Sequence, residues 1–195
     1  MENVFLRQMK PEELIELYTI IRRDFPSDER PPQVILKNQL KIGKCELLLL
    51  TDGQIDYAYA LCTLGANAHT LILLFAVFEE YRGKGLGSTF MHILAQRMKD
   101  KLSMIVEVEI PEKASSEIER VTRGRRIAFY ERLGFVSLTD IRYAAWNVPL
   151  MLMVLPLRDS LEQVRRDILQ IIPDIYAEQI GHEFLKKIQL SEWAK

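Results

Sequence analysis

The sequence predicts one α/β domain, and three stretches of the chain carry this prediction. The unbroken apolar run 71–77 is typical of a strand covered on both faces. A glycine-rich turn follows, and the apolar residues after it recur at helical spacing, at Leu86, Phe90, Ile93, Leu94 and Met98. The segment 104–110 alternates, which predicts a strand with an apolar face and a face that carries Glu107 and Glu109. Strands and helices therefore follow one another along one chain.

Length and charge agree with a single domain. The chain has 195 residues, is 48% hydrophobic and has a formal net charge of −1, which allows one buried core and predicts no nucleic-acid partner. We find no apolar run long enough for a membrane span and no signal-peptide pattern at residues 1–7, so we expect a cytoplasmic protein without a membrane partner. Cys45 and Cys62 fit neither a metal site nor a disulfide framework and are expected to be buried thiols.

The first third of the chain predicts three strands and two helices. Strands are expected at Val4–Met9, Glu46–Leu50 and Ile55–Thr63. The last two are joined by Asp52-Gly53, which is a strong hairpin signal. A helix is expected to begin at Pro11, with apolar positions at Leu14, Leu17, Ile20 and Ile21, and another at 33–42. Three prolines in the segment 24–32 separate the two helices.

Beyond the strand at 104–110, the pattern is less regular. Residues 111–124 form a charged connection with one or two helical turns near 117–121, and strands are expected at 135–138 and 150–155. One helix is expected from Leu161 to Ile172, Pro173 either kinks or stops it, and apolar spacing from Ile175 to Ile188 predicts another. This tail could pack on its own sheet, cover a cleft of the domain or form a homodimer.

The loop 79–87 has the features of a phosphate-binding turn. Gly83, Gly85 and Gly87 let the backbone turn tightly, and the N–H groups of the helix that follows attract an anion. A Walker motif is absent, and Ser88 stands where a dinucleotide fingerprint needs its third glycine. A pyrophosphate site is therefore predicted, and the alternative is a helix start with a flexible lead-in.

Two blocks together resemble a known superfamily. Arg82-x-x-Gly85-x-Gly87 after a strand resembles the acyl-CoA signature of the GNAT N-acyltransferases. The segment 125–135, with Phe129-Tyr130 and Gly134-Phe135, is similar to the second block of that superfamily. The resemblance is strongest over residues 46–140.

The resemblance implies a fold and an activity. The fold would be a GNAT-like domain at residues 1–157, with helices on both faces of a mixed, mostly antiparallel, splayed sheet of about seven strands, and a C-terminal helical extension at 158–195. The activity would be transfer of an acetyl group from acetyl-CoA to a small-molecule or peptide amine in a ternary complex, without a metal. A catalytically inactive acyl-CoA sensor or partner-binding module on the same fold is the alternative.

The resemblance also assigns cofactor residues. The pyrophosphate would be held by Arg82, Gly83, Lys84, Gly85, Leu86, Gly87 and Ser88, and the pantetheine arm by Phe75, Ala76 and Val77. Arg123 stands where many relatives have an asparagine that touches the cofactor, and Arg126 where an alanine is common. Two cations at the expected helix start oppose its dipole, which suggests an anionic neighbour, either a cofactor phosphate or Glu107 or Glu109. A solvated basic turn is the alternative.

Three residues are candidates for proton transfer. Tyr130 matches the tyrosine that many relatives place near the thioester sulfur, where it could return a proton, although it could also be an ordinary core aromatic. The central strand has no glutamate that could act as the base. Glu107 and Glu109 are the candidates instead, and the alternative is a solvated strand face or salt bridges to nearby arginines.

The acceptor is predicted from the acids of the break between the first two helices. Asp24, Asp28 and Glu29 lie where the family places the acceptor cleft. Carboxylates in a cleft concentrate cations, so a polycationic amine or a lysine-like side chain is predicted as the substrate. The alternative is that these acids only solvate the loop and cap the next helix, with Arg30 neutralising one of them.

Overall fold

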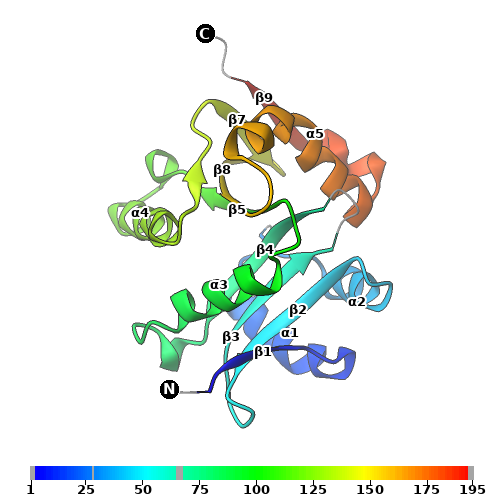
Figure 1. Ribbon diagram of the computed structural model, residues 1–195, viewed down its shortest axis with the longest axis vertical. Coiled ribbons are helices and arrows are strands. Elements are labelled where there is room, and N and C mark those ends of the chain that lie inside the picture. Colours follow the sequence, from blue (N-terminus) through cyan, green and yellow to red (C-terminus); the bar gives the residue numbers. More distant parts are fainter. Residues whose placement is uncertain (1–2, 28, 65–67, 193–195) are drawn as a thin grey trace. The chain divides into compact units, whose positions relative to one another are not determined.

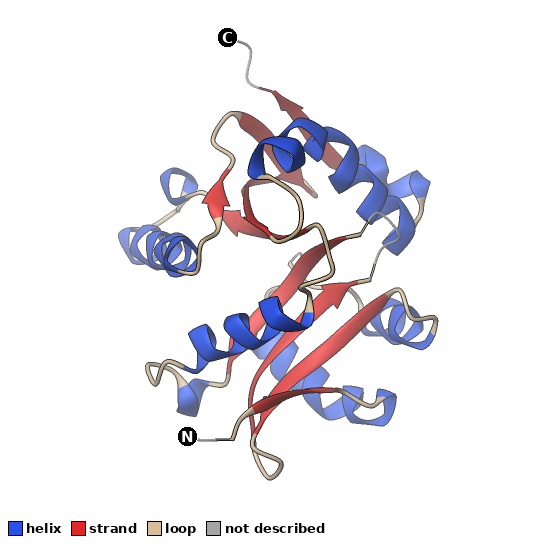
Figure 2. Cartoon of the chain, in the orientation of Figure 1, coloured by secondary structure: helices blue, strands red, loops and turns tan. Residues whose placement is uncertain are grey.

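The computed structural model describes residues 3–27, 29–64 and 68–192 and has the predicted α/β class (Figure 1, Figure 2). The chain forms two compact units. Unit 1 consists of Met1–Gly65 and Ile72–Arg97, and unit 2 of Ala66–Leu71 and Met98–Lys195. Each unit contains helices and strands of its own, and each is described separately below.

Unit 1 is built on antiparallel strands in the order β1 (Phe5–Gln8), β2 (Cys45–Thr51), β3 (Asp56–Thr63) and β4 (His69–Val77), the last of which begins in unit 2. The predicted hairpin is present between β2 and β3. Its turn has Gly53 at φ +95°, and Asp52 Oδ1 accepts hydrogen bonds from the main-chain N–H groups of Gln54 and Ile55. Its helices are α1 (Leu14–Asp24), α2 (Gln33–Lys41) and α3 (Leu86–Arg97).

Both faces of the unit 1 strands are covered, as a fully apolar strand requires. All seven residues of β2 are buried. Leu47 and Leu49 pack with the apolar side chains of α1 and α2, and α3 lies on the opposite side of the strands (Figure 1). Cys45 and Cys62 are buried free thiols, as predicted, and burial raises the pKa of Cys45 to about 12. The apolar residues that recur at helical spacing in α1 therefore lie in the hydrophobic core of this unit.

Unit 2 contains antiparallel strands in the order β5 (Ser103–Glu109), β8 (Val148–Pro156), β7 (Ile141–Ala145) and β9 (Ile188–Glu192). The short strand β6 (Val136–Ser137) also pairs with β8. The helices of this unit are α4 (Glu117–Arg132) and α5 (Leu161–Ile180). Within the described ranges, short 3-10 segments also lie at Pro111–Lys113 and His182–Lys187 in unit 2 and at Pro11–Glu13 and Glu79–Tyr81 in unit 1.

The tail differs from the sequence prediction. The prediction of a second helix over 175–188 is wrong. Helix α5 continues through Pro173 to Ile180, and a 3-10 segment and β9 follow it. The helix continues because residues on both sides of Pro173 are held by packing, with Ile172 and Ile175 fully buried. Such packing offsets the cost of an internal proline, which is about 3 kcal/mol. No strand is predicted at Ile141–Ala145, where the structure has β7.

Helix α5 packs on the strands of its own unit, which is one of the three places considered for the tail. Its residues Val164 and Ile168 are fully buried, and α5 contacts β8. Ile105, on the same face of β5 as Glu107, is also fully buried, so this face is not simply a solvated one. None of the helices in the described ranges is long and apolar enough to cross a membrane.

Gly134 joins α4 to β6 and offers a test of local backbone strain. Its φ is +89°, and an added Cβ would lie 3.3 Å from Leu155 Cδ1. We expect Gly134→Ala to lower the free energy of unfolding by about 1 to 2 kcal/mol, because an L-residue is strained at positive φ. Urea unfolding at constant m-value measures this change.

Gly124→Ala is the matched control. Gly124 lies inside α4, and nothing lies within 4 Å of an added Cβ. Alanine there should raise stability by about 0.5 to 1 kcal/mol, because glycine is entropically costly inside a helix. Equal effects of the two substitutions would contradict the strain at Gly134.

Candidate functional site

The glycine loop of unit 1 has the geometry of an anion-binding turn. Gly83 and Gly85 have φ of +76° and +78°, a region that favours glycine, and α3 begins at Leu86. The first hydrogen bond into the helix runs from Thr89 N–H to the carbonyl of Gly85, at 3.1 Å. The preceding N–H groups, those of Leu86, Gly87 and Ser88, belong to the first turn, which has no intrahelical acceptors. The loop therefore presents main-chain donors at a helix start.

The two basic side chains of the loop contact their own unit. Arg82 Nε donates to the carbonyl of Val77 at 3.0 Å, and Arg82 Nη2 lies 3.6 Å from Asp24 Oδ1. Lys84 Nζ donates to the carbonyl of Glu80 at 3.0 Å. These contacts stabilise the loop around the two glycines, so the main-chain N–H groups are the donors best placed for a phosphate.

Phe75, Ala76 and Val77 form the end of β4, just before the loop. They pair with residues 58–60 of β3, and the ring of Phe75 lies 5.1 Å from the ring of Phe90 in α3. The carbonyl of Val77 accepts the Arg82 hydrogen bond, so the strand end and the loop form one connected structure. Their role toward a pantetheine arm stays a prediction.

Asp24 at the end of α1 is not an open acidic group. Its side chain is 6% exposed and accepts a hydrogen bond from the Tyr59 hydroxyl at 3.1 Å. Arg23 Nε lies 3.2 Å from Asp24 Oδ1, and Arg82 Nη2 lies 3.6 Å from the same oxygen. Burial, together with the adjacent Asp24 carboxylate, raises the pKa of Tyr59. Asp24 therefore connects α1, β3 and the glycine loop, and Tyr59 is a partner that the sequence did not reveal.

The other acids assigned to the acceptor loop have different surroundings. Glu29 is exposed, and Asp28 lies outside the described residues. Arg30 donates to the Tyr18 hydroxyl at 2.7 Å and to the carbonyl of Phe25 at 3.1 Å. Arg30 thus contacts neutral groups of α1 and of the loop that follows it.

In unit 2, the two glutamates of β5 have different partners. Glu109 is paired with Arg123 at 2.6 Å and with Arg126 at 3.1 Å. Arg123 also donates to the carbonyl of Ile110 and lies 3.7 Å from Glu119. The anionic neighbour inferred for the two arginines is therefore Glu109 within the described residues, and these cations neutralise its charge.

The expectation that these arginines stand at a helix start is wrong. Helix α4 begins at Glu117, with Ser116 as its N-cap and two acids in its first turn. Arg123 and Arg126 lie in the middle of the helix, one turn apart, where the terminal dipole has little effect. Only one or two helical turns near 117–121 are predicted in the charged connection because its apolar positions are few, although its capping residues favour a longer helix.

Glu107 has a neutral hydrogen-bonding environment. The Tyr143 hydroxyl of β7 donates to Glu107 Oε1 at 2.5 Å. The Tyr176 hydroxyl of α5 lies 2.9 Å from Oε1 and 3.0 Å from Oε2. Burial raises the pKa of Glu107 above its ordinary value, and the two phenol hydrogen bonds act in the opposite direction. In the ranges that the structure describes, no basic side chain forms a salt bridge with this carboxylate.

Tyr130 lies in α4 with an aromatic environment. Its side chain is 6% exposed, and its ring lies 5.1 Å from that of Phe129 and 5.3 Å from that of Phe135. Edge-to-face packing of this kind fixes the ring. The predicted role of its hydroxyl as a proton donor stays a prediction.

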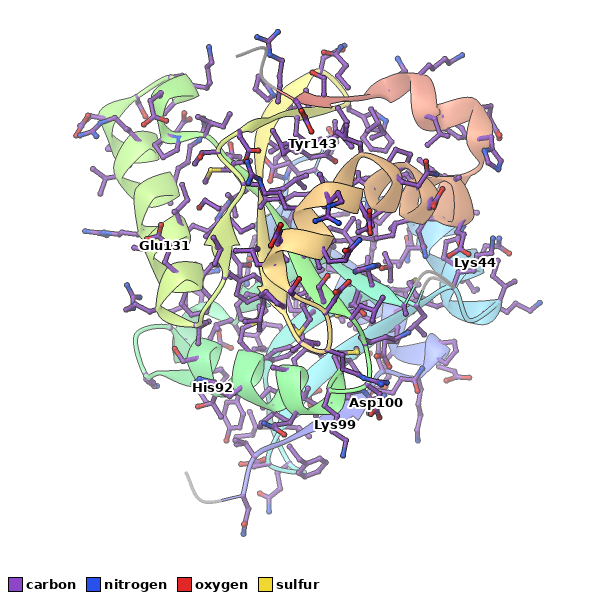
Figure 3. All side chains as sticks on the ribbon, turned by 45° about the horizontal axis from the view of Figure 1, so that its top comes forward. Lys44, His92, Lys99, Asp100, Glu131 and Tyr143 are labelled. Carbon is purple, nitrogen blue, oxygen red and sulfur yellow. The ribbon has the colours of Figure 1, made fainter. Side chains whose placement is uncertain are left out.

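Tyr143 and Tyr176 are site residues that the sequence reasoning missed. Tyr143, which Figure 3 labels, lies in β7, and the segment 141–145 alternates between buried and more exposed positions. In the sequence only Ile141-Arg142-Tyr143 alternates in this way, which is a weak signal for a strand. Tyr176 was assigned to an apolar helix stripe, and helical spacing alone gives no indication that its hydroxyl reaches a carboxylate.

Comparisons with known proteins identify the fold and the type of domain at residues 43–137. Residues 43–137 match the model of the acetyltransferase (GNAT) domain. Comparison with curated protein sequences gives no match. Many solved structures are similar, and three of them follow.

The ribosomal-protein-S18-alanine N-acetyltransferase from Escherichia coli has a TM-score of 0.60 at 20% identity, over 82% of this chain and 97% of its own. A putative GNAT acetyltransferase from Bacteroides thetaiotaomicron has a TM-score of 0.64 at 20% identity, over 86% and 97%. Spermidine N-acetyltransferase from Vibrio cholerae, solved with CoA and spermine, has a TM-score of 0.62 at 11% identity, over 80% and 97%. These likenesses show the fold, and the domain match shows that the chain carries an acetyltransferase domain of the GNAT superfamily, whose acyl donor is acetyl-CoA.

Proposed function

We propose that the protein transfers the acetyl group of acetyl-CoA to a cationic amine, and that Glu107 is the general base. The observation that carries this assignment is the contrast between the two acids of β5. Glu109 is neutralised by Arg123 and Arg126, whereas Glu107 is held only by phenol hydroxyls in the described part of the chain. A carboxylate without a bound cation is free to take a proton from an ammonium group.

The chemistry requires two proton transfers from the acceptor nitrogen. Glu107 takes the first, directly or through a water, and the neutral amine then attacks the thioester carbonyl. The C–N bond forms, the C–S bond breaks, and the second proton leaves the nitrogen as the amide forms. The sulfur leaves as a thiolate and gains one proton, so one proton is released overall. In this proposal Tyr130 donates the proton to the sulfur.

A raised pKa suits Glu107 for the proposed role of general base. An ammonium group has a pKa of about 10, and a base of very low pKa accepts its proton poorly. Burial raises the pKa of Glu107, which improves its ability to accept a proton. The glycine loop of unit 1 would hold the pyrophosphate of CoA through main-chain N–H groups.

The proposed acceptor carries positive charge and no carboxylate. Glu107 has phenol partners and no salt bridge in the described residues, and Glu29 is an exposed acid on the loop after α1. Such charges attract cations and disfavour carboxylated amines. The similar fold of a spermidine N-acetyltransferase supports testing polyamines first. A lysine-like side chain is the second member of this class.

The proposal is tested by thiol release from acetyl-CoA with polyamines, lysine-containing peptides, peptides with a free N-terminal alanine, and free amino acids. We expect the highest kcat/KM with an amine that has at least one further positive charge. For that amine, kcat/KM should fall several-fold between about 20 mM and about 300 mM salt, because screening weakens the attraction. A neutral amine of similar size is the control and should respond little to salt.

Two results would contradict the proposed acceptor. One is a best substrate that carries a free carboxylate, and the other is a rate with the polyamine that is indifferent to ionic strength. Absence of thiol release with every amine would contradict the proposed transfer itself.

A further inference from the structure

Three elements of unit 2 bring one carboxylate and two phenols together. Glu107 comes from β5, Tyr143 from β7 and Tyr176 from α5. The two tyrosines are 36 and 69 residues away from Glu107 along the chain. Both lie beyond residue 137, where the match to the GNAT domain ends. The two phenols of the cluster are therefore contributed by a part of the chain that the family match does not include, whereas Glu107 lies within the match.

Strand register explains why Tyr143 reaches Glu107. Strand β8 lies between β5 and β7, with Leu152 opposite Glu107 and Leu150 opposite Tyr143. Leu150 and Leu152 are two residues apart, so both pairs share one face of the strands. The long side chain of Tyr143 extends across β8 to the carboxylate. A shift of one residue in either pairing would turn one of the two side chains to the opposite face.

Packing fixes the position of Tyr176. Its side chain is 6% exposed, and its neighbours on α5, Ile172 and Ile175, are fully buried. The ring of Trp146 lies 5.5 Å from the ring of Tyr176. The main-chain N–H of Trp146 donates to the carbonyl of Lys187 at 2.9 Å. The Tyr176 hydroxyl therefore has little freedom to turn away from Glu107.

We propose that Tyr143 and Tyr176 are positioning residues that hold Glu107 in its ionised form and direct its Oε2 atom toward the acceptor amine. This inference rests on the proposed function of Glu107. Oε1 accepts from both tyrosines, whereas Oε2 accepts only the longer bond from Tyr176, at 3.0 Å. Oε2 thus keeps the greater capacity to accept the proton of an ammonium group.

Energetics support a role beyond packing. Burial disfavours the charged form of Glu107, and hydrogen bonds donated to a carboxylate favour it. The titratable groups that face Glu107 are Tyr143 from β7 and Tyr176 from α5, whereas β8 places the apolar Leu152 opposite it. Burial, followed by the Glu107 charge, raises the pKa of both tyrosines, which favours their protonated, hydrogen-bond-donating form.

The test is the pH dependence of kcat/KM in Tyr176→Phe, Tyr143→Phe and the double variant. Phenylalanine keeps the ring and removes the hydroxyl. We expect the acid limb of the profile to move to higher pH by about half a unit or more in each single variant, and further in the double variant. The rate should fall several-fold near the limb and recover toward the wild-type value at higher pH.

Tyr57→Phe is the matched control. The Tyr57 hydroxyl donates to Asp52 Oδ2 at 2.6 Å in the β2–β3 hairpin, so this variant also loses a bond between a phenol and a carboxylate. Its profile should coincide with that of the wild type. A purely structural role of Tyr143 and Tyr176 would lower the rate equally at every pH, or not at all, and either result would overturn the proposal.

A second measurement does not depend on activity. Carbon-13 NMR of glutamate-labelled protein follows the titration of Glu107, whose signal is assigned by its loss in Glu107→Gln. We expect the Glu107 titration midpoint to rise in Tyr176→Phe, and an unchanged midpoint would overturn the inference. If the midpoint rises but Glu107→Gln keeps full activity, the proposed function of Glu107 fails while the tyrosine contacts stand.

Discussion

Glu107→Gln is expected to lower kcat at least about 100-fold near neutral pH, because glutamine cannot take a proton from the ammonium group of the acceptor. CoA affinity should stay close to that of the wild type, since the glycine loop that we assign to the pyrophosphate belongs to unit 1. Steady-state thiol release and calorimetric titration with CoA measure the two quantities. A loss of kcat without a loss of CoA binding is the expected combination.

Glu109→Gln is the comparison for this experiment. Glu109 shares the same face of β5 but is paired with Arg123 and Arg126. Its replacement should change kcat less than about tenfold, because it removes ion pairs and not the base. Equal losses in the two variants would contradict the assignment of the base to Glu107. The wild-type acid limb should lie above the ordinary glutamate pKa of 4.5, because burial raises the pKa of Glu107.

The same pKa shift predicts how Glu107→Gln affects stability. In the unfolded chain Glu107 ionises at its ordinary pKa, which lies below its pKa in the folded protein. As pH rises between these two values, the unfolded state loses its proton first, so the stability contributed by this group falls. Near neutral pH the glutamine variant should therefore unfold at the same or a higher temperature than the wild type. If the Glu107→Gln variant is as stable as the wild type, its loss of activity is not caused by unfolding.

Arg97→Met is expected to lower the free energy of unfolding by about 2 to 4 kcal/mol. Arg97, at the end of α3, donates to Glu46 of β2 at 2.8 Å, and the Glu46 side chain is only 5% exposed. Removing the arginine leaves a buried carboxylate without its partner, which is more costly than losing an exposed ion pair. The lower part of the range allows for the 42% exposure of the Arg97 side chain. Urea unfolding measures the change.

The double variant Glu46→Met/Arg97→Met separates charge from packing. Replacing both partners by apolar side chains should restore most of the lost stability, because no unpaired charge remains. Arg22→Met is the surface control, since Arg22 is exposed on α1 and has no ion-pair partner in the described ranges. If Arg97→Met were as mild as Arg22→Met, the buried pair would contribute little to stability.

The sequence predicted the parts of the fold whose signals are local. The glycine loop before α3 and the hairpin at Asp52-Gly53 follow from backbone geometry that few residues allow. The helix predicted from Ile175 to Ile188 overlaps the start of β9, and β9 was not predicted because a strand at the edge of a sheet is defined by its neighbour, here β7. Pro173 was read as a kink or a stop because its cost is local, whereas the packing that offsets it is not.

The candidate site was predicted in part for the same reason. Glu107 and Glu109 could be placed on one strand face from alternation alone. Their different partners could not be predicted, because Arg123 comes from α4 and Tyr176 from α5, and helical spacing does not specify which strand residue a helix covers. Asp24 looked like an open loop acid, yet Tyr59 and Arg82 surround it once β3 and the glycine loop are in place.

The division of the chain into two units has a consequence for synthesis on the ribosome. Unit 1 uses no residue beyond Arg97, whereas the partners of Glu107 are contributed by β7 and α5. Translation adds about 5 to 20 residues per second, and domains that emerge early begin to fold first. The glycine loop can therefore form while Tyr176 is still being translated. A nascent chain would acquire the loop that we assign to the cofactor several seconds before it acquired the tyrosine partners of Glu107.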